Sequence, residues 1–159
     1  MKIEQLKENN IQIASELVLS ILHAEFINIF SNKGMNTLID FYSIEKIKDR
    51  IKEEDTIFYQ FINKEGFFMG VAEMENNHIV TLFIDNSYRN QKIATIFFYY
   101  LIENKLVKDT ISVYATPITI NFYKKHGFEP KSVNLKEEHG IVFMPMIKNL
   151  NHIPSPSSP

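Results

Sequence analysis

The stretch from residue 78 to residue 115 restricts the possible folds more than any other part of the chain. Its first run, residues 79–84 (IVTLFI), is almost wholly apolar, a pattern typical of a strand that is buried on both faces of a sheet. The polar segment 85–92 follows, after which apolar spacing predicts a helix over 91–107 and a β-rich run predicts a strand over 110–115. A strand, a crossover helix and a second strand in this order form a βαβ unit with parallel strands and a right-handed connection.

Two further β-rich runs lie immediately before this unit. Residues 56–62 and 67–74 are rich in β-branched and aromatic side chains, and the segments 63–66 and 75–77 contain the glycine and asparagines typical of turns. Together with residues 79–84 they predict an antiparallel meander whose last strand is central in the sheet.

The rest of the chain supplies the elements that flank this sheet. Asn9 and Asn10 are typical N-cap residues before an amphipathic helix, and a glycine such as Gly127 typically ends one. In chain order, we expect a strand within 1–7, helices over 11–30 and 36–53, a later helix capped by Thr116 with Pro117 in its first turn, and strands over 128–136 and 140–148. The predicted order is β-α-α-β-β-β-α-β-α-β-β, an α/β (α+β) fold with a mixed, mostly antiparallel sheet flanked by helices.

The composition is that of one packed domain. The chain has 159 residues, of which 45% are hydrophobic and 23% charged, and this balance excludes wholesale disorder and coiled coil. Residues 1–150 are enough to bury a single core. Residues 151–159 (NHIPSPSSP) contain three prolines and three serines, which predicts a tail outside the domain.

Charge and residue content exclude several classes of function. Lys and Arg number 17 and Asp and Glu 19, so the net charge of −2 leaves no basic footprint for non-specific nucleic-acid binding. The chain has no cysteine, which excludes disulfides, thiolate metal sites and a cysteine nucleophile. The longest apolar stretch, 93–102, is half the roughly 20 residues that a membrane-spanning helix needs. With no secretory signal at the N-terminus, we expect a cytoplasmic protein that binds neither membranes nor nucleic acids.

The polar segment after the apolar strand is the first candidate for a binding site. It leads into the N-terminus of a helix, where unpaired backbone N–H groups and the positive end of the helix dipole favour an anion such as pyrophosphate. Most strand–loop–helix units bind no ligand, so this signal alone does not identify a function.

Two motifs about 30 residues apart resemble the GNAT-type N-acetyltransferases. Residues 79–94 resemble the family's acetyl-CoA motif, a strand followed by Arg/Gln-x-x-Gly-x-Gly/Ala, with Arg89 at the first position and Ala94 at the last. Residues 115–128 (ATPITINFYKKHGF) resemble its small-Pro-x-x-x-x-Phe-Tyr-x-x-x-Gly-Phe stretch, and the closing strand is similar to that of part of the family. The chain departs from the motif at Lys92, where the family usually has glycine.

The resemblance implies direct transfer of an acetyl group from acetyl-CoA to a primary amine of a small molecule or a peptide. It implies that acetyl-CoA lies in a V-shaped opening between the strands at 79–84 and 110–115. The residues that the family match assigns to the cofactor are Leu82, Phe83 and Ile84 on the strand, and Arg89, Asn90, Gln91, Lys92, Ile93, Ala94 and Thr95 in the loop and helix start. The alternatives are a non-catalytic GNAT-like module that binds an acyl-CoA or a protein partner, and an unrelated α/β ligand binder. A homodimer is compatible with either family interpretation.

Four residues are candidates for chemistry, and each has a structural alternative. Tyr123 resembles the family's tyrosine acid, or else packs half-buried on Phe128. His78 begins the central strand and has an ordinary pKa near about 6.5, which suits a general base, although a turn histidine is the alternative. Glu73 is a candidate for positioning a water or an amine, or is a solvated strand carboxylate. Asn121 is a candidate for a cofactor hydrogen bond, or faces solvent.

The two N-terminal helices are expected to supply the acceptor side. Phe26, Phe41 and Tyr42 are candidates for lining an acceptor pocket, with core packing as the alternative. Glu25 is a candidate for attracting a cationic amine, or faces solvent. The remaining histidines lack metal-ligand spacing, so we expect no metal site; they are His23, His126, His139 and His152.

Overall fold

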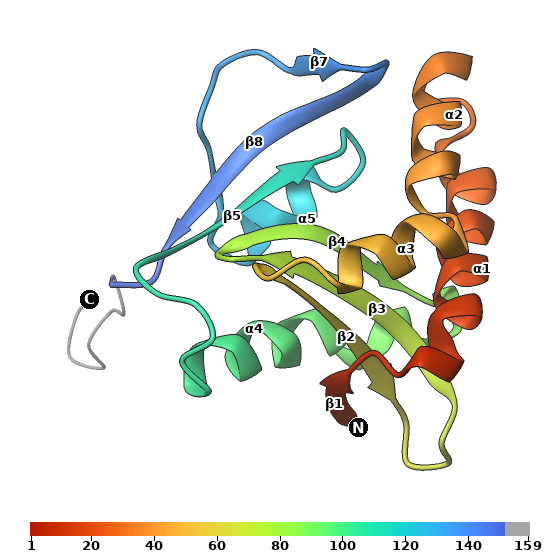
Figure 1. Ribbon diagram of the computed structural model, residues 1–159. Coiled ribbons are helices and arrows are strands. Elements are labelled where there is room, and N and C mark those ends of the chain that lie inside the picture. The colour runs from red at the N-terminus through yellow and green to blue at the C-terminus, as the bar shows by residue number, and fades with distance from the viewer. Residues whose placement is uncertain (152–159) are drawn as a thin grey trace.

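The computed structural model describes residues 1–151 and places β4 (His78–Ile84) at the centre of an eight-stranded sheet (Figure 1). The strand order is β1-β2-β3-β4-β5-β8-β6, and β7 pairs with β8. The other strands are β1 (Lys2–Gln5), β2 (Thr56–Ile62), β3 (Phe68–Glu75), β5 (Thr110–Ala115), β6 (Glu129–Pro130), β7 (Lys136–Glu138) and β8 (Ile141–Asn149). Residues 152–159, nearly all of the predicted tail, lie outside the described residues.

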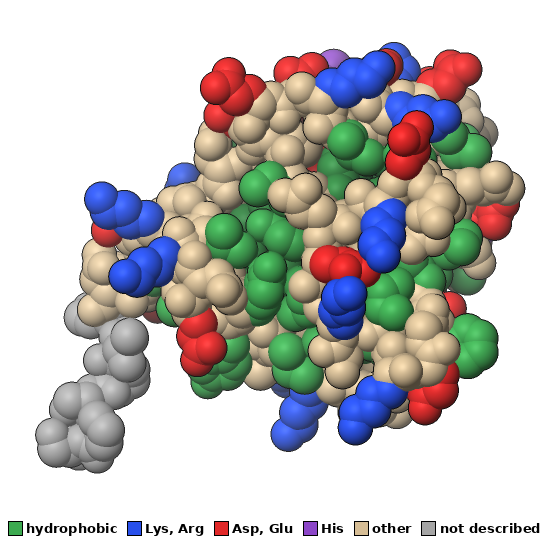
Figure 2. Space-filling model, turned by 60° about the horizontal axis from the view of Figure 1, so that its bottom comes forward, with side chains coloured by type: hydrophobic (Ala, Val, Ile, Leu, Met, Phe, Trp, Pro, Cys, Tyr) green, Lys and Arg blue, Asp and Glu red, His purple; other side chains and the backbone are tan. Residues whose placement is uncertain are grey.

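Helices cover both faces of this sheet (Figure 1). The α-helices are α1 (Ile11–Ile21), α2 (Asn32–Phe41), α3 (Ile44–Ile51), α4 (Ile93–Glu103) and α5 (Ile120–Lys125). Short turns of other helix types are the 3-10 helices η1 (Glu8–Asn10) and η3 (Asn86–Gln91) and the π-helix η2 (Leu22–Phe26). Figure 2 shows the face on which α4 lies, where hydrophobic side chains reach the surface among charged ones.

Two hydrophobic cores lie on opposite faces of the meander. Successive residues of a strand point to opposite faces, so Val71 packs in the core beneath α1 while its neighbour Ala72 packs in the core beneath α4. The same alternation places Phe58 in the first core and Tyr59 in the second. Burial on both faces explains the dense apolar runs, and the predicted antiparallel meander with a central last strand is confirmed.

The βαβ unit opens a gap in the sheet. β4 and β5 are parallel, as predicted, but their ladder contains only the pairs His78↔Ser112 and Ile79↔Val113. β4 continues to Ile84 without β5 as a partner, because β5 diverges from it, while the opposite edge of β5 pairs with β8 from Thr110 to Ala115. The mixed, mostly antiparallel sheet of the sequence prediction is therefore confirmed, and its one parallel pair diverges.

The predicted N-terminal helices are each divided. The helix expected over 11–30 is α1 followed by the π-helical turn η2, and the helix expected over 36–53 is α2 followed by α3. Serine residues are the N-caps of α2 and α3, because each hydroxyl accepts a hydrogen bond from a backbone amide in the first turn. The amide of Gly34 donates to Ser31 Oγ at 3.2 Å, and that of Lys46 donates to Ser43 Oγ at 3.3 Å.

Three predicted boundaries in the second half were wrong. α4 begins after Lys92 and is shorter than 91–107. α5 is capped at Thr119 rather than Thr116, since residues 116–119 form a turn first. The strand expected over 128–136 is only the short β6, because Pro130 has no amide N–H and the exposed residues after it, such as Val133, bury nothing.

Candidate active site

The divergence of β4 and β5 leaves two adjoining cavities. The larger, about 910 Å³, lies among the second half of β4, residues 89–95, η2 and α5, and is called the loop cavity here. The smaller, about 350 Å³, lies among β4, β5, α2 and the β7–β8 turn, and is called the apolar cavity. The residues that line both, and so mark where they meet, are Phe26, Leu82, Phe83, Thr119 and Tyr123.

The loop cavity brings together most of the residues that the sequence assigned to a cofactor. Its lining includes Leu82, Phe83, Ile84, Arg89, Asn90, Lys92, Ile93, Ala94 and Thr95. Gln91 and Asn121 do not line it; both are exposed. Gln91 and Asn121 thus differ from their neighbours in sequence, because the backbone of η3 and of α5 turns these two side chains toward solvent.

α5 and η2 supply residues of the loop cavity that the motif in the sequence does not include. Lys125 of α5 adds a basic side chain to its wall. His126 also lines it and joins α5 to α4, since its Nδ1 lies 2.9 Å from the carbonyl of Phe122 and its Nε2 lies 3.0 Å from Thr95 Oγ1. A carbonyl only accepts, so Nδ1 is the donor there, and in the neutral imidazole Nε2 accepts from the threonine hydroxyl.

Lys92 has the backbone conformation that explains glycine in the motif. Its φ of 55° and ψ of 32° are left-handed, and it forms the junction between η3 and α4. Glycine adopts this conformation freely, whereas a residue with a Cβ does so at a cost in free energy. Lys92 therefore keeps the shape of the loop that the glycine would give, with a basic side chain added beside the loop cavity.

Arg89 is held by an acidic residue from the other side of the loop cavity. Its guanidinium makes a bidentate ion pair with Glu25 of η2, in which Nη1 contacts Oε1 and Nη2 lies 2.9 Å from Oε2. Its Nε donates to the carbonyl of Ile84 at 3.2 Å. Glu25 is thus paired with an arginine. The sequence had suggested only that Glu25 attracts a cationic amine or faces solvent.

Tyr123 lies where the two cavities meet. Its ring is 6% exposed and packs edge-on against Phe128, with ring centroids 5.3 Å apart. Burial raises the pKa of its phenol well above the ordinary value of 10, and the neighbouring Tyr42 raises this pKa further. The hydroxyl therefore stays protonated at neutral pH, as a proton donor must.

Neither His78 nor Glu73 lines either cavity. His78 is at the paired end of β4, with Nδ1 2.8 Å from Ser112 Oγ and its ring against Tyr114, and burial lowers its pKa. Glu73 is 1% exposed, so the solvated carboxylate suggested from the sequence was wrong. Burial raises the pKa of Glu73, and Arg50 partly offsets this increase.

Residues 26–150 match the family model described as "Acetyltransferase (GNAT) domain". The chain belongs to the GNAT acetyltransferase family. No curated protein sequence matches it significantly.

Solved structures of this family share the fold of this GNAT domain. PaiA N-acetyltransferase from Thermoplasma acidophilum, solved in complex with coenzyme A, has a TM-score of 0.74 at 20% identity, over 93% of this chain and 98% of that one. A GNAT-family acetyltransferase from Staphylococcus aureus Mu50 has a TM-score of 0.68 at 22% identity, over 94% and 98%. A variant of spermidine N-acetyltransferase SpeG from Vibrio cholerae has a TM-score of 0.62 at 11% identity, over 94% and 95%.

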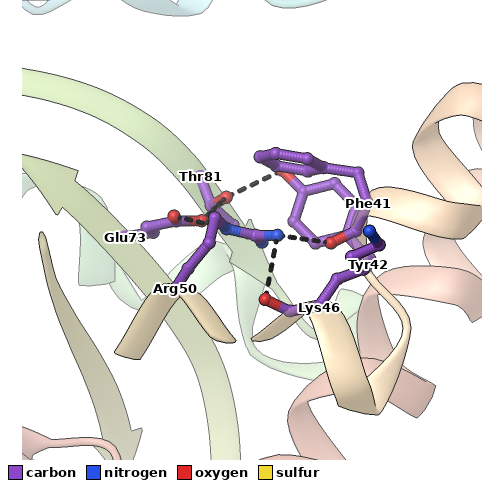
Figure 3. A network of polar contacts seen from close by, with 6 residues as sticks. All are labelled: Phe41, Tyr42, Lys46, Arg50, Glu73 and Thr81. Carbon is purple, nitrogen blue, oxygen red and sulfur yellow. Dashed lines mark hydrogen bonds and ion pairs between the residues drawn. The ribbon is translucent and has the colours of Figure 1, made fainter. Parts of the chain in front are cut away.

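A buried polar network lies behind the apolar cavity of this GNAT domain (Figure 3). Arg50 of α3 pairs with Glu73 through Nε to Oε2 at 2.8 Å and Nη2 to Oε1 at 3.2 Å, and its Nη1 donates to the carbonyl of Phe41 at 2.6 Å. Thr81 Oγ1 donates to Glu73 Oε1 at 3.0 Å and lies 2.7 Å from the hydroxyl of Tyr42. Since a threonine hydroxyl has one hydrogen, Tyr42 donates to Thr81, and the chain of hydrogen bonds runs from the cavity wall to the carboxylate.

The sequence contains one signal for these ion pairs. Only two of its 17 basic residues are arginines, Arg50 and Arg89, and each forms a bidentate pair with a glutamate. Arginine suits such pairs because its planar guanidinium matches a carboxylate. Which glutamate each would meet was not visible, because the partners are 23 and 64 positions away.

Residues 1–151 were also considered as a membrane-spanning or metal-binding chain. No helix in that range combines the length and hydrophobicity needed to cross a bilayer. Within the same range, no three His, Asp or Glu side chains are grouped so that they could hold a metal ion.

Proposed function

We propose that this GNAT domain transfers an acetyl group from acetyl-CoA to a primary amine. The observation that carries the proposal is the position of Tyr123, a buried and protonated phenol at the junction of the loop cavity and the apolar cavity. Two substrates that enter from the two cavities would meet beside Tyr123.

The loop cavity has the size and chemistry of a coenzyme A site. Its volume of about 910 Å³ is at the upper end of the roughly 300–1,000 Å³ of small-molecule sites. Beyond Ile79 the edge of β4 that faces β5 has no ladder partner, so backbone groups from Leu82 to Ile84 are available to the amide arm. The N-terminus of α4, with Lys92 and Lys125 nearby, suits the phosphates.

The reaction requires one bond to form, one to break and one proton to move. The neutral nitrogen of the acceptor attacks the thioester carbonyl, a C–N bond forms and the C–S bond breaks. The nitrogen loses one proton and the sulfur gains one, which gives the amide and the free thiol. Tyr123 is the proposed donor to sulfur.

Of the two proposed bases, Glu73 has the better connection to the substrates. Thr81 and Tyr42 link its carboxylate by hydrogen bonds to the wall of the apolar cavity. His78 bonds Ser112 at the closed end of the β4–β5 pair. We therefore favour Glu73 over His78 as the group that ultimately receives the proton of the ammonium form of the acceptor.

Acetyl-CoA is expected to raise the melting temperature. A ligand that binds only the native state at 100 times its Kd adds about 2.7 kcal/mol to the free energy of unfolding. For a chain of this size that corresponds to roughly 5–10 °C, measured by calorimetry or dye fluorescence. Sodium chloride at equal ionic strength is the control for general ionic effects. The absence of any shift at millimolar acetyl-CoA would contradict the proposal.

Two substitutions at Lys92 are expected to separate backbone shape from charge. Lys92→Gly should raise the free energy of unfolding by about 1 kcal/mol, because glycine removes the cost of the left-handed conformation, and Lys92→Met should not. Both should weaken coenzyme A binding about fivefold at low salt, and less at high salt, because both remove a charge beside the phosphates. Tighter binding by Lys92→Gly than by wild type would show instead that the side chain crowds the loop.

A non-catalytic module that binds an acyl-CoA is the alternative, and Lys92 at the glycine position was its basis. The left-handed backbone of Lys92 removes much of that basis. A thermal shift by acetyl-CoA, without thiol release in the presence of any amine, would favour the alternative.

A further inference from the structure

We infer that the acceptor is a small amine with an aromatic or other apolar body and a single positive charge, and that polyamines are poor acceptors. This inference rests on the proposed function, and it concerns the apolar cavity. Eight of the 20 residues that line this cavity are aromatic and seven are aliphatic. None is a lysine or an arginine, and the single carboxylate is that of Glu138, an exposed residue in β7.

The aromatic wall is fixed before any substrate binds. The ring of Phe83 makes edge-to-face contacts with Phe26 and Tyr42, with centroids 6.3 Å and 5.7 Å apart, and Phe26 stacks on Phe30 at 5.6 Å. Aromatic rings attract one another in these geometries, so the wall offers the same faces and edges to an aromatic substrate. An apolar body that enters the cavity also leaves water, which favours its binding.

The carboxylates that would bind a polyamine are engaged elsewhere. Glu25 pairs with Arg89 in the loop cavity, and Glu73 pairs with Arg50 behind the cavity wall. A second ammonium deep in the apolar cavity would lose water without gaining a buried charged partner, because the one carboxylate in the lining, that of Glu138, is exposed to solvent, and this loss is costly. The amine that reacts also loses water against this apolar wall. For this amine the loss helps the reaction, because desolvation lowers its pKa and favours the neutral nucleophile.

The dimensions favour a small molecule over a peptide. The volume of about 350 Å³ is near the lower end of small-molecule sites, roughly 300–1,000 Å³. One side is closed where α2 meets the turn between β7 and β8: a Cβ on Gly34 would overlap the carbonyl oxygen of Gly140, and Thr37 Oγ1 lies 3.0 Å from the carbonyl oxygen of His139. This contact leaves no space there for a peptide backbone.

Thiol release from acetyl-CoA with a panel of amines tests the inference. 2-Phenylethylamine should have a kcat/KM about 10- to 100-fold above that of ethylamine, from burial of the ring. Spermidine and a lysine-containing peptide should rank below 2-phenylethylamine. A ranking with spermidine or the peptide at the top overturns this inference and leaves the proposed function intact. If none of the amines causes thiol release, both this inference and the proposed function are overturned.

A pair of variants tests whether the cavity wall sets this preference. Leu38→Glu places a carboxylate in the wall and should raise the spermidine to 2-phenylethylamine ratio of kcat/KM about tenfold, as expected for one charge pair. Ile44→Glu makes the same kind of change on the exposed start of α3, outside the cavity, and should leave the ratio as in wild type. Equal ratios in Leu38→Glu, Ile44→Glu and wild type, with all three folded by circular dichroism, would overturn the inference.

Discussion

Arg50→Met is expected to lower the free energy of unfolding by about 3–5 kcal/mol, the usual cost of removing one partner of a buried ion pair. The carboxylate of Glu73 is 1% exposed, and two of its hydrogen bonds come from this guanidinium. Arg50 also donates to the carbonyl of Phe41 and stacks 3.6 Å from its ring centroid, so the substitution loosens the end of α2 as well. Urea denaturation at neutral pH measures the loss.

Glu73→Gln is expected to lower the free energy of unfolding by less than Arg50→Met does. The side chain of Arg50 is 17% exposed, so water solvates it in part when its partner is gone, whereas the carboxylate of Glu73 has no such access. The double variant should recover part of the loss of Arg50→Met, because no uncompensated charge remains buried. Equal losses in the two single variants would show that the network stabilises by packing rather than by charge.

The effect of Arg50→Met should depend on pH. Burial already raises the pKa of Glu73 above its ordinary value of 4.5, and loss of Arg50 raises this pKa further. The native state then holds the proton more tightly than the unfolded state, so stability is lost as pH rises through the native pKa. The difference between wild type and Arg50→Met should therefore shrink toward pH 4 and be largest near pH 8.

Tyr123→Phe is expected to lower kcat by about 10²–10⁴-fold, the usual contribution of a general acid. Phenylalanine keeps the ring contacts with Phe122 and Phe128, so coenzyme A affinity and stability should change little. Because burial raises the pKa of this phenol, no fall in its donor capacity is expected between pH 6 and pH 9 in wild type. Steady-state kinetics with the best amine of the panel measures kcat, and a titration with coenzyme A measures the affinity.

Tyr99→Phe is the matched control for this substitution. Tyr99 lies on α4, is 63% exposed and lines neither cavity, so loss of its hydroxyl should leave kcat unchanged. Wild-type turnover in Tyr123→Phe would assign Tyr123 to core packing and remove the main support for the proposed function.

The sequence by itself determined the elements whose signals are local. The apolar run 79–84, the polar loop and the following helix specified the crossover, and they also supply half of the residues that line the loop cavity. Hydrophobic periodicity reports which face of one segment is buried. It does not report a serine that starts a new helix within an apolar pattern, which is why Ser43 and the break between α2 and α3 were missed.

The tertiary structure alone decided how distant segments meet. Glu25 and Arg89 are 64 positions apart, Tyr42 and Thr81 are 39 apart, and the contact of Thr37 with His139 spans 102. Such contacts arise from packing of whole elements against each other, and side-chain type along the chain carries no record of the partner. The residues of the loop, and three aromatic residues of the apolar cavity, Phe26, Phe41 and Tyr42, could therefore be named from local sequence, but the way in which distant segments enclose that cavity could not.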